Sequence, residues 1–335
     1  MLSNYNLRPH NTFGIDARCR RFVELNTVEE SVSFLRTSAL DREPLLIIGS
    51  GSNLLLTADY EGTVIHSAIH GVQATCQGDA VYVRAGSGMQ WDQLACRCTC
   101  NGWYGTENLA LIPGEVGAAA VQNIGAYGAE VAPLVSKIEV VNVRDGSLSV
   151  FPASQCSYGY RDSRFKHEWK GRYLITHVTL RLSRTFTPLL DYGNIRTELQ
   201  RKGIEKPTAR QLRDVIVEIR RNKLPDPQLT GSAGSFFMNP VVAKEQYREL
   251  AALYPGMPHY TVDEDHEKIP AGWMIDQCGW KGRSLGRAGV HHNQALVLVN
   301  RGGASGADIL RLCDAIRRDV KEKFGIDIYP EVNVR

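Results

Sequence analysis

The sequence predicts a protein that mixes α-helices with β-strands in more than one domain. The chain has 335 residues, and domains usually hold ~100–200 residues, so two or three are expected. Hydrophobic residues make up 43% and charged residues 22% of the chain, which is typical of globular proteins with apolar cores. Amphipathic segments with helix caps lie among short β-branched runs, which indicates helices and strands in one fold.

Helices and strands are predicted throughout the first half of the chain. Residues 26–39 are predicted as a helix, because Thr27 and Glu30 make a capping box and the following apolar residues share a face. Residues 43–56 are predicted as a buried strand that runs into a Gly/Ser turn. The other predicted elements are strands at 63–67 and 81–86, a helix at 89–102 ended by Asn101-Gly102, a hairpin at 137–151 around Asp145-Gly146, and an alternating strand at 172–183.

The second half begins with a helix at 208–222, which Thr208 and Gln211 cap and which presents Leu212, Val215, Ile216 and Ile219 on one face. The proline-rich stretch "NKLPDP" follows at 222–227 and predicts a domain boundary. Further on we expect a strand at 294–300, a helix from Ser305 that stops at Gly325, and a strand-like end at 326–335.

Charge and hydropathy exclude several function classes. The net charge is +3, without a run of five Lys or Arg residues, so no nucleic-acid partner is expected. The N-terminus lacks an apolar run of signal-peptide length, and no stretch approaches the ~20 apolar residues of a membrane span. We therefore expect a cytoplasmic protein with reduced cysteines and no membrane partner.

Three of the eight cysteines, Cys96, Cys98 and Cys100, form a C-x-C-x-C cluster in a predicted helix. Residues two apart on a helix point to different faces, so the sulfurs do not converge on a metal. The prediction is free buried thiols and no metal site.

Two segments are rich in glycine. The first, the GSGSN loop (residues 49–53), follows a strand, so its backbone N–H groups and hydroxyls suit a phosphate; a plain Gly/Ser turn is the alternative. A nicotinamide-dinucleotide Rossmann domain is disfavoured, because Leu54 occupies the third glycine position of that fingerprint and no helix pattern follows.

The second, the glycine segment (residues 110–128), reads "ALIPGEVGAAAVQNIGAYG". It is too long for one turn and too irregular for a helix. Glycine permits positive φ and close approach of the backbone to a neighbour. Two interpretations remain open: tight packing of two backbones, or a long flat ligand along the main chain with Gln122 and Asn123 at its polar edge.

Blocks along nearly the whole chain resemble the UDP-N-acetylenolpyruvoylglucosamine reductase family. The blocks are "NTFGID" (11–16), "IIGSGSNLLL" (47–56), "NLALIPGEVGAAAVQNIGAYG" (108–128), "YGYRDSRFK" (158–166), "LDYGNI" (190–195), "RNKLPDP" (221–227), "GSAGSFFMNP" (231–240), "AGWMIDQCGWKG" (271–282) and "YPEV" (329–332). The blocks at 158–166 and 190–195 resemble the longer subtype, which has an extra substrate-covering Tyr loop.

The resemblance implies an α+β fold: an FAD-binding unit of two subdomains, similar to vanillyl-alcohol-oxidase-type flavoenzymes, plus an α/β substrate-binding domain. It places FAD-binding subdomain 1 at 1–68 together with the C-terminal strand at 326–335. Subdomain 2 is expected at 69–221 and the substrate-binding domain at 222–325.

The resemblance also implies a reaction in which NADPH reduces bound FAD, and FAD then reduces UDP-N-acetylglucosamine enolpyruvate to UDP-N-acetylmuramate. We expect FAD without a covalent link. Where the family often has hydroxyl residues, this chain has Ala118-Ala119, so contacts there would come from the backbone. The FAD-binding residues implied are Gly49, Ser50, Gly51, Ser52, Asn53, Pro113, Gly114, Gly117, Ala118, Ala119, Asn123, Gly125, Ala126 and Gly128.

Three residues receive catalytic roles from the resemblance. Arg161 binds and polarises the substrate carboxylate, and Glu331, protonated or sharing a proton, assists it; Ser235 donates a proton to the α-carbon. The alternative for Arg161 is a surface ion pair with Asp162, and without the family Glu331 is better explained as an ordinary strand end. Tyr192, Lys223 and Asn239 match positions that hold the nucleotide diphosphate and sugar, and Gln294 is expected in the substrate cleft, with a plain loop residue as the alternative.

Two other functions remain open. A flavin oxidase or dehydrogenase of the same fold would act on another alcohol or sugar and would not need Arg161, Ser235 and Glu331 together. A nucleotide-sugar binding protein would have no catalysis and no flavin. No protein partner is expected to be required.

Overall fold

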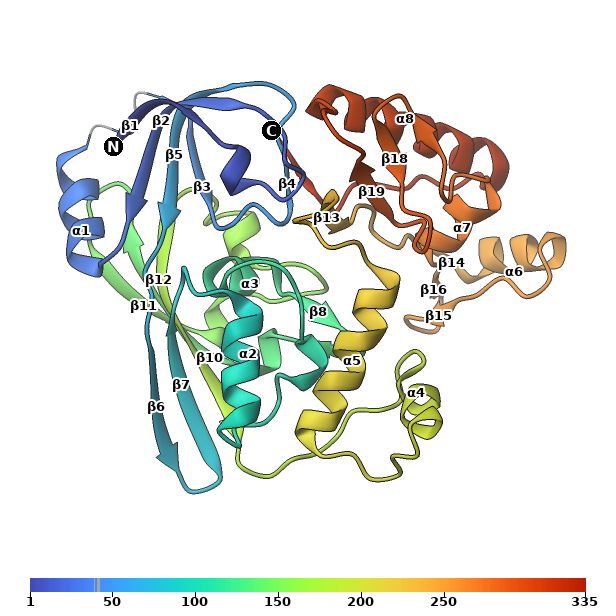
Figure 1. Ribbon diagram of the computed structural model, residues 1–335, viewed down its shortest axis with the longest axis horizontal. Coiled ribbons are helices and arrows are strands. Elements are labelled where there is room, and N and C mark those ends of the chain that lie inside the picture. Colours follow the sequence, from blue (N-terminus) through green and yellow to red (C-terminus); the bar gives the residue numbers. More distant parts are fainter. Residues whose placement is uncertain (39, 41–42) are drawn as a thin grey trace. The chain divides into compact units, whose positions relative to one another are not determined.

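The computed structural model describes residues 1–38, 40 and 43–335, and it confirms a mixed α+β fold (Figure 1). The chain forms two compact units. Unit 1 comprises residues 1–5, 19–50 and 61–220, and unit 2 comprises residues 6–18, 51–60 and 221–335. The three predicted domain ranges stay a prediction.

A five-stranded antiparallel sheet, in the order β11-β10-β12-β7-β6, forms the larger core of unit 1. The helices α2 (Trp91–Cys100) and α3 (Val116–Gln122) belong to the same core. The strand β12 (Tyr173–Ser183) is buried along most of its length rather than alternating as predicted, because both of its faces are covered. The remaining strands are β6 (Val72–Gln77), β7 (Ala80–Gly86), β10 (Val135–Asn142) and β11 (Leu148–Pro152), and a small hairpin joins β8 (Gly125–Ala126) to β9 (Ala129–Glu130).

The second sheet of unit 1 has the order β1-β2-β5-β3, and α1 (Val28–Thr37) contributes to its core. Thr27 caps α1 as predicted, but the Glu30 carboxylate accepts from the backbone N–H of Asn26 rather than that of Thr27. Ala39, the last residue of the predicted helix, lies outside the described residues. The strands are β1 (Leu2–Asn6), β2 (Arg18–Leu25), β3 (Leu45–Ile48) and β5 (Tyr60–Ser67).

Two further helices, α4 (Ile195–Arg201) and α5 (Ala209–Lys223), pack together; α4 and α5 up to Arg220 belong to unit 1, and the last three residues of α5 belong to unit 2. The Thr208–Gln211 capping box is present, and the four apolar residues predicted to share a face of α5 are all buried.

Unit 2 contains the sheet β13-β19-β18-β17 and the sheet β14-β16-β15. The helix α8 (Gly306–Phe324) begins directly after Ser305, where the helix was predicted to start, and Ser305 is its N-cap; it ends at Gly325 as predicted, which has φ +68°. The predicted strand at 326–335 is largely wrong, because within it only β20 (Asn333–Val334) is a strand, paired with β4 (Leu54–Leu55), and Pro330 forms an isolated bridge with Phe237. The other elements are β13 (Gly231–Ser235), β14 (Val241–Ala243), β15 (Tyr260–Thr261), β16 (His266–Lys268), β17 (Ser284–Leu285), β18 (Ala288–Val290), β19 (Val297–Asn300), α6 (Lys244–Leu253) and α7 (Ala271–Gln277).

Two other predictions need correction. The glycine segment is not irregular throughout, because α3 lies within it, where three consecutive alanines favour a helix. All eight cysteines are free, but in the predicted cluster only Cys98 is buried, and Cys100 is exposed at the end of α2.

Candidate active site

Residues 49–50 of the GSGSN loop meet the glycine segment within unit 1. A Cβ placed on Gly49 would lie 3.2 Å from the Cβ of Ala118 and 3.0 Å from Oε2 of Glu115. Glu115 is the N-cap residue of α3, so the loop after β3 touches the start of that helix. The small side chains at 49 and 118 are therefore explained in part by close packing of two backbones, one of the two interpretations of the sequence.

Asn123 ends α3 in a left-handed conformation, with φ +44°. Its side-chain amide nitrogen donates to the Glu130 carboxylate at 2.9 Å and to the Gly159 carbonyl at 2.7 Å, and its oxygen accepts from the Ala132 N–H at 3.0 Å. The side chain is buried, and its hydrogen bonds join the end of α3 to Glu130, Ala132 and Gly159. A contact between this residue and FAD stays a prediction.

Arg161 lies against the glycine segment. It occupies a tight turn in which Gly159 and Asp162 exchange backbone hydrogen bonds, and its φ is +54°, which is uncommon for a side chain of this size. Its guanidinium donates to the carbonyls of Asn123 and Gly125. The Asp162 carboxylate contacts His167 at 2.8 Å. Unit 1 thus brings the predicted carboxylate-binding arginine to the predicted FAD-binding segment.

Tyr192 lies next to the glycine segment as well. A Cβ placed on Gly128, whose φ is +80°, would lie 3.2 Å from the Cβ of Tyr192. The tyrosine side chain is 46% exposed. The structure therefore places a predicted substrate residue beside a predicted FAD residue in the same unit.

Ser235 lies at the end of β13 in unit 2, beside an irregularity of the sheet. Ser232 pairs with Val299 and Ser235 with Val297, so the register shifts between them, and Gly234 has φ +70°. Such bulges redirect a side chain from the regular alternation of a strand. Ser235 is exposed there.

Glu331 lies on the segment next to Ser235. Its N–H donates to the carbonyl of Phe236 at 2.8 Å, and the side chain of Asn53 donates to its carbonyl at 3.4 Å. Two predicted catalytic residues and one predicted FAD residue thus belong to neighbouring segments of unit 2.

Three predicted substrate residues lie in one region of unit 2. Oδ1 of Asn239 accepts from the N–H of Ala271 at 2.9 Å, and a Cβ on Gly272 would lie 3.2 Å from Oε1 of Gln294. Both residues therefore lie at the start of α7. Lys223 is exposed at the end of α5, next to Asn222, whose carbonyl accepts from the side chain of Asn293 at 3.0 Å.

Arg220 is a cation to which the sequence patterns assigned no role. Its Nε donates to the carbonyl of Leu111 at 3.3 Å, so the guanidinium contacts the glycine segment. Burial lowers the pKa of Arg220, with a smaller lowering contribution from the charge of Arg161 and opposing contributions from Tyr127 and Asp92. Asp92 is bound to Arg213 at 2.7 Å. The sequence does contain a sign of this cation: Arg213 and Arg220 lie seven residues apart beside the apolar face of α5.

The backbone of the GSGSN loop gives a stability prediction. Gly51 has φ +67°, and a Cβ there would lie 2.0 Å from the His10 carbonyl oxygen, within unit 2. Gly51→Ala is expected to cost about 2–4 kcal/mol of unfolding free energy, because positive φ and a backbone clash add. Gly14→Ala is the matched control, since Gly14 has φ +65° with nothing within 4 Å. If chemical denaturation gave the same loss of unfolding free energy for both variants, the close approach of Gly51 to the His10 carbonyl would be unimportant.

Two models of known protein families match separate parts of the chain. Residues 19–151 match the family model described as "FAD binding domain", and residues 226–335 match "UDP-N-acetylenolpyruvoylglucosamine reductase, C-terminal domain". No helix among the described residues has the length and apolar character needed to cross a membrane.

Proteins named UDP-N-acetylenolpyruvoylglucosamine reductase are similar over nearly the whole chain. One from Bacteroides fragilis (strain YCH46) is 52% identical over 335 residues, covering 99% of each chain, and one from Burkholderia multivorans is 45% identical over 334 residues, covering 99% of this chain and 96% of the relative. The crystal structure of UDP-N-acetylenolpyruvylglucosamine reductase from Thermus caldophilus superposes with a TM-score of 0.68 at 25% identity, covering 98% of this chain and 97% of that one. The chain therefore belongs to the UDP-N-acetylenolpyruvoylglucosamine reductase family.

Proposed function

We propose that Arg161, Ser235 and Glu331 perform the chemistry of an NADPH-dependent flavoenzyme. The chain reduces UDP-N-acetylglucosamine enolpyruvate to UDP-N-acetylmuramate in peptidoglycan precursor synthesis, with FAD as cofactor. The observation that most supports the proposed roles is the contact of the Arg161 guanidinium with the carbonyls of Asn123 and Gly125 in the glycine segment.

The residues of unit 1 fit FAD. Where residues 49–50 meet the glycine segment, Gly49 and Ala118 carry no bulky side chain, and the partly desolvated cation Arg220 contacts the carbonyl of Leu111 in the same segment. A desolvated cation on a segment with small side chains suits an anionic, extended ligand. Bound there, FAD would supply the hydride-transfer chemistry between NADPH and the substrate double bond. We propose that the fourteen residues named from the sequence hold it, together with Arg220.

Arg161 binds the substrate carboxylate in this proposal. Negative charge develops on that carboxylate when hydride reaches the β-carbon, and two parallel N–H donors of a guanidinium stabilise it. The carbonyls of Asn123 and Gly125 fix the orientation of the guanidinium. A fixed donor stabilises developing charge without reorganisation during the reaction.

Ser235 protonates the α-carbon in this proposal, and Glu331 assists from the neighbouring segment. The bulge at Gly234 places the hydroxyl in an exposed position, and the hydrogen bond from Glu331 to Phe236 holds the two segments together. Glu331 must hold or share a proton, because an ionised carboxylate would repel the enolate-like charge.

Tyr192, Lys223, Asn239 and Gln294 bind the nucleotide diphosphate and sugar in this proposal. Lys223 supplies a point charge for the diphosphate. The grouping of Asn239 and Gln294 at the start of α7 supports a shared role.

We also propose a cytoplasmic enzyme that needs no protein partner. Both co-substrates are phosphorylated molecules, which do not cross a membrane unaided. The eight cysteines, all free in the structure, suit a reducing compartment.

FAD is expected to be released by denaturation, because neither glycine-rich segment contains a His or Cys to which the flavin could be linked. Acid precipitation of the yellow protein should leave the colour in the supernatant. Colour that remains in the washed pellet would contradict a non-covalent link.

Anaerobic mixing tests the proposed function. NADPH should bleach the flavin absorbance, and the enolpyruvyl nucleotide should restore it with formation of the lactyl ether. Reoxidation by an alcohol-derived or sugar substrate alone would favour a flavin oxidase or dehydrogenase. A colourless protein that binds the nucleotide sugar would favour a binding protein without catalysis.

A further inference from the structure

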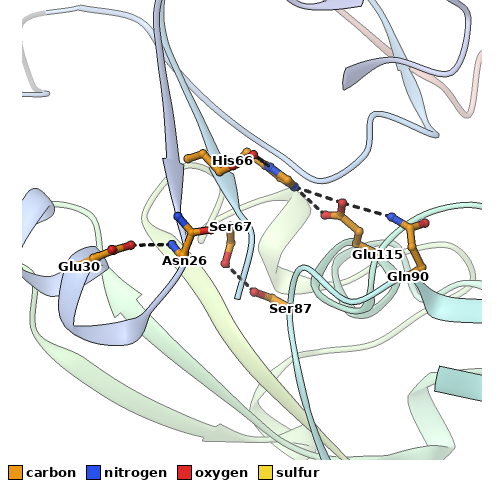
Figure 2. A network of polar contacts seen from close by, with 8 residues as sticks. Asn26, Glu30, His66, Ser67, Ser87, Gln90 and Glu115 are labelled. Carbon is orange, nitrogen blue, oxygen red and sulfur yellow. Dashed lines mark hydrogen bonds and ion pairs between the residues drawn. The ribbon is translucent and has the colours of Figure 1, made fainter. Parts of the chain in front are cut away.

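His66 lies between two carboxylates in unit 1. It is near the end of β5, and its side chain is 10% exposed. Its Nε2 is 3.1 Å from both carboxylate oxygens of Glu115, and its Nδ1 is 3.0 Å from Oε2 of Glu24 on β2. Figure 2 shows Glu115 between His66 and Gln90, whose amide nitrogen donates to Glu115 at 3.5 Å.

This geometry favours a charged imidazole over a neutral one. A carboxylate only accepts hydrogen bonds, and a neutral imidazole has a single N–H, so a neutral ring would leave one nitrogen lone pair facing a carboxylate. Burial favours the neutral ring, but the hydrogen bonds and charges of Glu115, and then of Glu24, outweigh it and raise the pKa of His66 above its usual 6.5. The charged groups that face His66 are Glu24 from β2 and Glu115 from the start of α3, whereas β3 places Ile48 beside it.

Glu115 connects this ion pair to the glycine segment. It follows Gly114 and caps α3, and its carboxylate lies 3.0 Å from the position of a Cβ on Gly49. The same carboxylate therefore contacts His66 on one strand and lies against the loop after β3. A second chain of contacts also connects β5 to α3. The hydroxyls of Ser67 on β5 and Ser87 are 2.6 Å apart (Figure 2), and the carbonyl of Ser87 accepts from the N–H of Gly117.

We propose that His66 is a positioning residue for FAD: through Glu115 it holds the start of α3 against Gly49, so that residues 49–50 and the glycine segment keep the spacing the cofactor needs. The inference rests on FAD binding by this chain. His66 does not touch the reacting atoms and acts only through Glu115.

The pH dependence follows from the sign of the shift. Because the pKa of His66 is raised in the folded protein, the ion pair is fully present below about pH 6.5 and is lost as the pH rises through the folded-state pKa. FAD should therefore bind most tightly at the acidic end of the range pH 6–9. By linkage, bound FAD should raise the pKa of His66 further.

The test measures the FAD dissociation constant between pH 6 and 9 from the fluorescence of released FAD. For the unmodified protein it should rise about 10-fold across the titration of His66, the size expected for a charge-assisted hydrogen bond. His66→Gln should bind FAD about 10-fold more weakly at pH 6 and show no pH dependence. Glu115→Gln should also lose the pH dependence, because the carboxylate that responds to the imidazolium is gone.

His177→Gln is the matched control. His177 is another largely buried histidine of unit 1 near a glutamate, but that glutamate, Glu139, lies on β10 and outside the glycine segment. Its variant should retain the pH dependence of FAD binding. Histidine NMR titration of the unmodified protein, with and without FAD, measures the pKa of His66 directly and needs no variant to fold.

Two results would overturn the inference. One is an FAD affinity that is independent of pH and equal in His66→Gln. The other is a His66 that stays neutral from pH 6 upward or whose pKa does not respond to FAD. A protein that binds no FAD at any pH would instead refute cofactor binding itself, so the two failures are distinguishable.

Discussion

Ser235→Ala is expected to separate the two half-reactions. Reduction of the flavin by NADPH should keep its rate, because no step of that transfer uses the Ser235 hydroxyl. Oxidation of the reduced flavin by the enolpyruvyl nucleotide should slow by about 10²–10⁴-fold, the usual loss when a positioned general acid is removed. Serine is a weak acid, so it serves only where the acceptor is strongly basic, as the carbanion-like α-carbon is.

Stopped-flow absorbance of each half-reaction measures both rates. Ser235 is exposed, so the alanine variant should fold normally, and Ser284→Ala, an exposed serine on β17 of the same sheet, is the control. Cysteine at 235 should restore part of the second rate, since a thiol is a stronger acid of similar size. Equal slowing of both half-reactions would point to damage near the flavin, and an unchanged second half-reaction would assign the proton to another group.

Arg161→Lys should lower the rate of the second half-reaction by about 10²–10³-fold, the cost of losing a fixed donor to a developing oxyanion. Lysine keeps the charge but cannot offer two parallel donors to a carboxylate. It also cannot hold the carbonyls of both Asn123 and Gly125 in the geometry of a guanidinium. The loss should therefore appear in kcat/KM for the enolpyruvyl nucleotide.

The control for the charge-conserving change is Arg201→Lys, because Arg201 lies on the surface of α4 and pairs with Glu198 and Glu218. Flavin absorbance should be unchanged in both variants. Turnover of Arg161→Lys near that of the unmodified protein would remove Arg161 from the carboxylate-binding role.

The local elements of this fold were predictable because their signals lie within one turn or one hairpin. Thr208 with Gln211 and Ser305 with Asp308 form reciprocal caps three residues apart, and Gly325 ends α8 with positive φ. Such contacts need no tertiary partner. The prediction failed where the local signal was weak. The helix α3 was not predicted, because glycines surround its alanines, and most of residues 326–335 form no strand, although their pattern suggested one.

The family, the cofactor and the candidate residues could be predicted without coordinates, because they depend on residue types in ordered blocks. Which of these residues meet could not be predicted, because the partners lie far apart in the chain. His66 and Glu115 are 49 positions apart, Asn53 and Glu331 are 278 apart, and Arg220 reaches Leu111 across 109. No sequence pattern distinguishes Glu24 and Glu115 from other carboxylates. They form one site because β2, β5 and α3 place them around the buried imidazole of His66. The physical reason is that burial and charge pairing depend on packing between distant segments, which no local pattern of side chains encodes.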